Sequence, residues 1–117
     1  MKVVNDTGVH KDARHGWYRS ADIQITDTRR LHVFVMRTSN GQIVMSCHEM
    51  ELSEQGYWTW NVFGAFSADV FRQRFARATQ EVVSRVWATY FPKVMEIAET
   101  RRAALTEHEK DKANAAT

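Results

Sequence analysis

Apolar and polar residues alternate along four segments between Trp17 and Phe63, and this alternation predicts four β-strands. The four segments are residues 17–25, 31–38, 42–52 and 57–63. Short polar connections separate them, which favours an antiparallel meander. From Ser67 onwards the apolar residues recur every three or four positions, as in a long amphipathic helix. The order of these elements predicts an α+β fold, with a four-stranded meander followed by a helix.

The turn between the second and third strands determines which side chains share a face. Asn40-Gly41 favours a two-residue type I′ turn, in which both central residues have positive φ. This turn would place Phe34 opposite Cys47 and His32 opposite Glu49. The core face is then expected to contain Trp17, Ile23, Ile25, Leu31, Val33, Val35, Val44, Met50, Leu52, Trp58, Trp60 and Val62. A shift of one residue would move every side chain of a strand to the other face.

The helical part of the sequence begins with Ser67, a good N-cap residue. Pro92 is expected to break or kink this helix, with a second helical segment continuing to about Thr106. The apolar arc of the first helix widens beyond what a single sheet would cover. We therefore expect a homodimer whose interface includes Val83, Trp87, Tyr90 and Val94.

Length and composition narrow the class of protein. A chain of 117 residues corresponds to one domain, and we assign residues 17–106 to it, with an irregular arm at 1–16 and a disordered tail at 107–117. No apolar run approaches the ~20 residues that a membrane helix needs. The single cysteine, Cys47, excludes an internal disulfide and favours a reducing compartment. We expect a cytoplasmic protein that does not contact membranes.

Few residues suggest catalysis or metal binding. In the expected register His32 and Glu49 are neighbours, and a histidine–carboxylate pair can perform acid–base chemistry. No nucleophile accompanies them, so an enzyme is only an alternative hypothesis. Cys47, His48 and Glu49 resemble a ligand cluster, but alternation along a strand turns His48 away from the other two. We expect no metal and no cofactor.

The second face of the sheet is too apolar for a face exposed to water, which suggests a partner. Methionine and aromatic side chains are enriched at protein interfaces. The expected binding residues are Phe34, Met36, Ile43, Met45, Phe63, Tyr18 and Tyr57. A small non-enzymatic protein that binds another protein is the first hypothesis, for example an accessory or inhibitory factor of the kind that phages and plasmids carry.

Single-stranded nucleic acid is the alternative partner, because aromatic rings on a sheet can stack with unpaired bases. The chain has eleven arginines against five lysines, and arginine suits phosphate recognition. The arginines expected to contribute are Arg14, Arg29, Arg30, Arg74, Arg77 and Arg85. On the helix, Arg77-Glu81 and Glu81-Arg85 have the i,i+4 spacing of ion pairs, so a self-neutralising solvated face is the competing interpretation.

Overall fold

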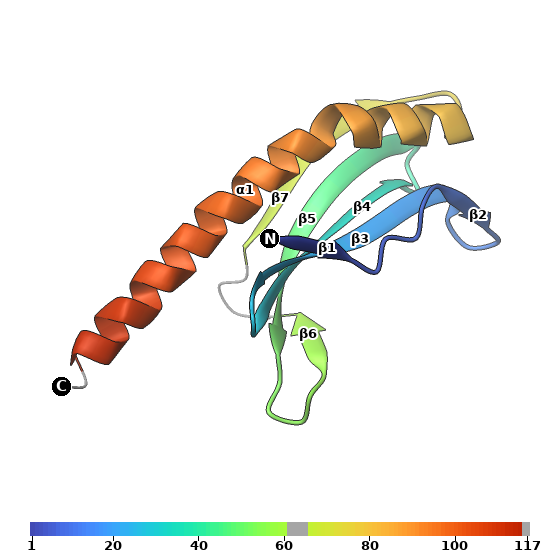
Figure 1. Ribbon diagram of the computed structural model, residues 1–117. Helices are drawn as coiled ribbons and strands as arrows, with labels where there is room; N and C mark the ends of the chain where they lie inside the picture. The colour runs from blue at the N-terminus through green and yellow to red at the C-terminus, as the bar shows by residue number, and fades with distance from the viewer. Residues whose placement is uncertain (61–65, 116–117) are drawn as a thin grey trace.

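The computed structural model describes residues 1–60 and 66–115, which form an antiparallel sheet of seven strands with one C-terminal helix (Figure 1). The elements are β1 (Lys2–Val4), β2 (His10–Asp12), β3 (Gly16–Thr26), β4 (Arg29–Arg37), β5 (Gln42–Leu52), β6 (Trp58–Trp60), β7 (Ser67–Arg74) and α1 (Gln80–Ala115). This arrangement confirms the α+β class. The four-stranded meander was an incomplete prediction, because the sheet also contains β1, β2 and β7.

The three long strands β3, β4 and β5 form the centre of the sheet, and each outer edge is shared by two shorter strands. β1 and β2 both pair with β3, so the segment 1–16, expected to be irregular, contributes two strands. On the other edge β6 pairs with the last residues of β5, and β7 pairs with residues 42–48. The short strands thereby satisfy backbone groups that would otherwise be unpaired along β3 and β5.

Ser67–Arg74 forms β7, so the prediction of a helix beginning at Ser67 was wrong. Phe71 and Phe75 are four residues apart, which fits a helix, but the backbone of this segment instead pairs with the free edge of β5. The helix begins at Gln80. Thr79 caps it, because its Oγ1 accepts a hydrogen bond of 3.2 Å from the backbone N–H of Val82.

The register between β4 and β5 differs by one residue from the predicted one. Among described non-glycine residues only Asn5 has positive φ, so Asn40 does not form a type I′ turn; Gly41 alone is left-handed, with φ +83°. Thr38 N–H donates to the Gln42 carbonyl at 2.8 Å, which closes a three-residue turn. Phe34 therefore lies opposite Ser46, and His32 opposite His48.

This shift reverses the two faces of β5. Its helix-facing residues are Ile43, Met45, Cys47 and Glu49, all at most 2% exposed. Val44, Ser46, His48 and Met50 alternate with them. The predicted core positions on β3 and β4 are confirmed, but the assignments of Val44 and Met50 to that core were wrong.

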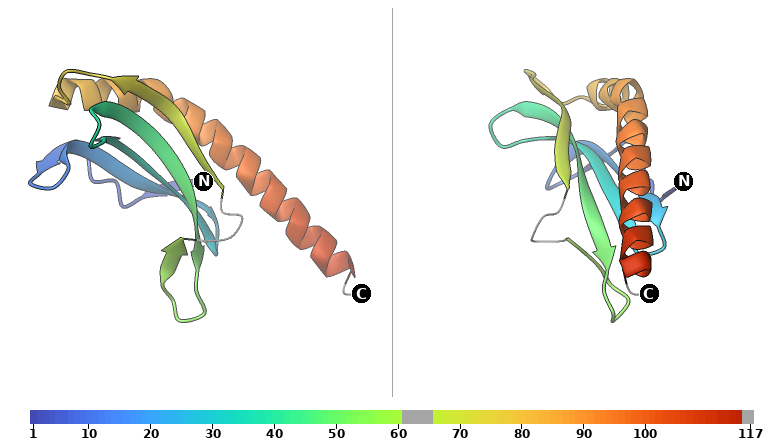
Figure 2. Two further views of the ribbon diagram at one scale, coloured as in Figure 1. Left: turned by 180° about the vertical axis from the view of Figure 1, so that it is seen from behind. Right: turned by 90° about the vertical axis from the view of Figure 1, so that its left-hand side faces the viewer.

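The core lies between α1 and one face of the sheet, and Figure 2 shows the helix on that side only. Val83, Trp87 and Val94 are at most 4% exposed and pack in this core. Tyr90 is half-buried, with its ring 4.8 Å from that of Phe71. These are the residues predicted to form a dimer interface, and that prediction loses its basis because the chain's own sheet already covers them.

α1 is a single helix of 36 residues that passes through Pro92 without interruption, so the predicted second helical segment was wrong. A proline removes one helical hydrogen bond, but Val94 and Ala98 beyond it are fully buried, and this packing holds the next turns in place. The helix extends through residues 107–115, where the sequence suggested disorder, and its second half projects beyond the sheet (Figure 1).

Candidate binding face

The sheet face turned away from α1, here called the open face, has no described helix over it (Figure 2). Alternate positions of the three long strands contribute its side chains. They are Tyr18, Ser20, Asp22 and Gln24 from β3, Arg30, His32, Phe34 and Met36 from β4, and Val44, Ser46, His48 and Met50 from β5. The open face combines aromatic, histidine and polar residues.

A polar row crosses the middle of the open face, because Asp22, His32 and His48 are direct cross-strand neighbours. Asp22 Oδ1 lies 2.7 Å from His32 Nδ1, and Asn5 donates to Asp22 Oδ2 at 3.0 Å. Burial raises the pKa of Asp22, but the hydrogen bonds from His32 and Asn5 outweigh it and hold the pKa below its usual range. Asp22 therefore remains ionised and orients the ring of His32.

Aromatic rings surround the two histidines of this row. Trp60 meets His32 and His48 edge-on, with ring centroids 5.4 and 5.5 Å away. Phe34 stacks on His48 with nearly parallel rings and centroids 5.6 Å apart. Burial lowers the pKa of His48, and the neighbouring His32 lowers it further. We call His32, Phe34, His48 and Trp60 the aromatic–histidine cluster.

A hollow of about 290 Å³ lies beside this cluster and is called the aromatic hollow. Its lining residues are His15, Tyr18, Ser20, His32, Phe34 and Met36. The ring of Tyr18 is flanked by those of His10 and His15, at centroid distances of 4.0 and 5.2 Å. Flat rings thus continue from the centre of the sheet towards the turn between β2 and β3.

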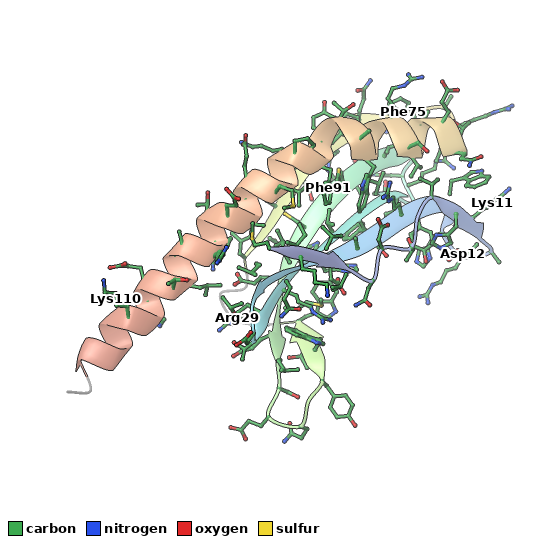
Figure 3. The ribbon with its side chains drawn as sticks, viewed as in Figure 1. Lys11, Asp12, Arg29, Phe75, Phe91 and Lys110 are labelled. Atoms are coloured by element: carbon green, nitrogen blue, oxygen red, sulfur yellow. The ribbon has the colours of Figure 1, made fainter. Side chains whose placement is uncertain are left out.

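A larger cavity of about 780 Å³ follows at that end of the sheet, where three connections meet: residues 13–15, 38–41 and 75–79. Its charged lining residues are Lys11, Arg14, Arg37 and Arg77, and no carboxylate lines it. We call it the basic cavity. Figure 3 shows Lys11 and Phe75 at this end of the molecule and Arg29 at the opposite end of the sheet. Within the described chain, none of the four cations forms an ion pair.

The aromatic hollow and the basic cavity adjoin one another, because His15 and Met36 line both. A further hollow of about 580 Å³ extends the cationic region from Arg37 to Arg74. One end of the open face therefore offers ring surfaces and positive charge side by side.

The apolar patch predicted for protein contact does not assemble. Tyr18, Phe34 and Met36 do meet, in the aromatic hollow. Ile43 and Met45 are instead fully buried against α1, because of the register shift. Tyr57 is 71% exposed at the turn before β6, away from the others. The remaining member of the predicted patch, Phe63, lies outside the described residues.

The predicted arginines divide between two ends of the sheet and the helix. Arg14 and Arg77 line the basic cavity, and Arg74 is next to it. Arg29 is paired with Glu51 at 3.4 Å, and Arg85 with Glu81 at 2.6 Å, which confirms a self-neutralising pair on the helix.

Arg30 lies at the β6 end of the open face. Its guanidinium donates to Gln24 at 2.6 Å and lies over the ring of Trp58, 4.2 Å from the centroid. Arg30 therefore stabilises Gln24 and Trp58 at this end of the sheet and is not part of the basic cavity.

The predicted pairing of His32 with Glu49 does not form. Glu49 faces α1 and accepts hydrogen bonds from Arg101, whereas His32 pairs with Asp22 on the opposite face. Cys47 also faces the core, where burial raises the pKa of its thiol to about 11. The acid–base hypothesis in its original form is therefore wrong.

Four contributors to the site were missed by sequence reasoning: Lys11, Arg37, His48 and Trp60. Lys11 and Arg37 each adjoin a turn at the same end of the sheet, and only the missed strand β2 brings Lys11 there. The shifted register assigned Trp60 to the core and placed His48 on the core side of the sheet, opposite Val33. A three-residue turn at Gly41 would have placed His48 correctly.

Among the described residues, no group of three histidine, cysteine or acidic side chains is arranged to hold a metal ion. Nor does the described chain contain a helix long and apolar enough to cross a membrane. Comparison with protein-family models, with curated proteins and with solved structures found no match. A functional hypothesis therefore depends on the geometry of the open face and the basic cavity.

Proposed function

We propose that this protein binds single-stranded nucleic acid across the open face, with bases against the aromatic rings and phosphates at the basic cavity. The position of the aromatic hollow next to the basic cavity, with His15 and Met36 lining both, carries this proposal. Proteins that bind single strands without base pairing combine these same two elements, stacking rings and a positive track.

The rings on the open face suit unpaired bases. Phe34 and His48 present parallel faces, and Trp60 is 53% exposed despite its size. A base stacked on an aromatic side chain contributes about 1–3 kcal/mol. Two or three such contacts, together with charge attraction, would favour binding of a single strand. A duplex offers no free base faces, so single strands should bind more tightly.

The charges on the open face also favour an anionic ligand. Asp22 is occupied by His32 and Asn5, and Asp69, opposite Ser46 on β7, is occupied by Ser46 and Arg72. The hydrogen bonds from Ser46 and Arg72 hold the pKa of Asp69 below its usual range. The cations of the basic cavity are not neutralised in this way, so the local potential there is positive although the net charge is only +2.

The test is a fluorescence anisotropy titration with labelled single-stranded DNA, single-stranded RNA and duplex DNA at low and moderate salt. We expect saturable binding of single strands that weakens steeply with salt. Trp60→Ala should reduce affinity about tenfold, whereas Trp60→Phe, which keeps a ring, should retain most of it. Phe34→Ala should likewise reduce the affinity about tenfold, whereas Phe34→Tyr should retain most of it.

Equal affinities of Trp60→Ala and the wild type would show that no base stacks on Trp60. Absence of binding at low salt would reject a nucleic-acid ligand altogether. Contact with a partner protein, the first hypothesis from the sequence, would then be the proposal to pursue.

A further inference from the structure

We infer that the basic cavity is a phosphomonoester site that holds the terminal phosphate of a bound strand. The protein would then prefer phosphorylated ends over internal stretches of nucleic acid. This inference rests on the proposed function of the open face, and adds the chemical class of the strand end that it selects.

The charge of the basic cavity matches that of a terminal phosphate. Lys11 on β2, Arg14 in the turn that follows it, Arg37 at the end of β4 and Arg77 in the connection before α1 all line one cavity. An internal phosphodiester has one negative charge, whereas a terminal phosphate carries about −1.5 to −2 at pH 7 and three terminal oxygens. Arginine forks donate in pairs to such oxygens. Four cations therefore match a terminal phosphate better than a single phosphodiester.

The nearby carboxylates do not compete for these cations. Asp12 accepts hydrogen bonds from the backbone N–H groups of Arg14 and His15, at 2.9 and 2.6 Å. Glu81, in the first turn of α1, is paired with Arg85. Asp12 stays ionised, because the hydrogen bond from the His15 N–H holds its pKa below its usual range, but the four cations outnumber this one neighbouring charge.

The polar lining adds donors of the right kind. The hydroxyl-bearing residues Ser39 and Thr79 line the cavity, and α1 begins directly after Thr79. The positive end of the helix dipole therefore borders the cavity and adds to the attraction for an anion.

The position of the cavity favours a strand end. It lies where the open face stops, among the three connections, so a strand that ends there would place its last nucleotide in the cavity. The base of that nucleotide could enter the aromatic hollow, because His15 and Met36 belong to both spaces. Tyr18 and Phe34 would be its stacking partners.

The experiment compares oligonucleotides of one sequence that carry a 5′-phosphate, a 3′-phosphate or no terminal phosphate, each with an internal fluorophore. We expect one phosphorylated form to bind at least tenfold more tightly than the unphosphorylated form. Arg37→Ala and Arg77→Ala should abolish this preference while weak binding of the unphosphorylated strand persists. Arg102→Ala, which removes an exposed arginine outside the cavity, should keep the preference and serves as the matched control.

Competition identifies the source of the phosphate group. Millimolar inorganic phosphate should reduce the preference for the phosphorylated end, and a mononucleotide should do so at lower concentration because its base also contacts the aromatic hollow. If all three oligonucleotides bind equally, the inference is overturned while the proposed function stands. If no oligonucleotide binds, both are overturned, even if inorganic phosphate alone binds to the cavity.

Discussion

Arg101 of α1 donates two hydrogen bonds, of 3.2 and 2.9 Å, to Oε2 of Glu49, which lies 52 residues earlier on β5. Glu49 is 2% exposed, and its Oε1 has no hydrogen-bond partner among the described residues. Arg29 Nη1 lies 3.9 Å from this oxygen. The guanidinium of Arg101 also lies over the ring of Phe66. This buried ion pair attaches the helix to the sheet shortly before the helix projects into solvent.

Removing Arg101 should destabilise the protein, because Glu49 would be left as an uncompensated buried charge. Breaking a fully buried pair costs about 3–5 kcal/mol. Because 29% of the Arg101 side chain remains exposed, we expect about 1–3 kcal/mol for Arg101→Ala, measured by urea unfolding. The double variant Glu49→Met with Arg101→Met should recover most of this loss. A change below about 0.5 kcal/mol in Arg101→Ala would mean that the pair contributes nothing to stability.

The turn at Gly41 gives a direct test of the register. With φ +83°, Gly41 occupies a region in which an alanine is strained, and Gly41→Ala should destabilise by about 1–2 kcal/mol. Asn40→Ala should cost about 0.5 kcal/mol or less, because the φ of Asn40 is not positive and the variant loses only an exposed hydrogen bond from Thr38. Comparable losses in the two variants would instead support a type I′ turn and the other register. Thermal unfolding of both, with Ser39→Ala as control, decides between them.

The turn also explains how far the sequence predicts this fold. Alternation located the strands that became β3 to β6, and the three-to-four spacing of apolar residues found the helix that packs on them. Asn40-Gly41 is compatible with two turn lengths, however, and the sequence alone does not distinguish them. That single ambiguity moved His48 to the core side of the sheet and placed Glu49 beside His32. The aromatic–histidine cluster was therefore not predictable, although every one of its residues is visible in the sequence.

A second ambiguity concerns Ser67–Arg74, whose apolar residues fit either a helix or a strand. The decision is made by tertiary structure, because β5 offers a free edge along residues 42–48. Lys11 illustrates the same limit: β2 is only three residues long, and its pairing with β3 is what brings Lys11 to the basic cavity. Long-range pairing of this kind leaves little trace in local sequence.

The histidine at position 48 should make stability depend on pH. Burial lowers its pKa in the folded protein, so the unfolded chain binds the proton more readily. The contribution of His48 is therefore fully present above the unfolded pKa of about 6.5 and is lost as the pH falls through the folded value. His48→Phe keeps a ring against Phe34 and Trp60, and should reduce the fall in Tm between pH 7 and pH 5. His108→Ala, at an exposed helix position, should show the same fall in Tm as the wild type. If His48→Phe also shows the wild-type fall in Tm, groups other than His48 cause the pH dependence.

Salt dependence should report the phosphate contacts of the basic cavity. Each lost contact between a cation and a phosphate of a single strand lowers the slope of log K against log salt by about 0.7. Arg14→Ala should therefore bind single-stranded DNA with a slope shallower by about that amount, and more weakly at low salt. Arg85→Ala, whose side chain is already paired with Glu81, should keep the wild-type slope. Identical slopes in all three proteins would place Arg14 outside the contact region.

Pro92 lies at an exposed position within the continuous helix, and its replacement should increase stability. Proline cannot donate to the carbonyl four residues earlier, and in a helix interior it costs up to about 3 kcal/mol relative to alanine. Val94 and Ala98, which follow Pro92, remain fully buried. The proline therefore destabilises the helix without disrupting its packing on the sheet. We expect Pro92→Ala to raise the free energy of unfolding by about 1–3 kcal/mol, measured with urea, with Lys93→Ala as an exposed control close to neutral. A loss of stability in Pro92→Ala would show instead that the local geometry imposed by the proline is needed to direct Val94 and Ala98 onto the sheet.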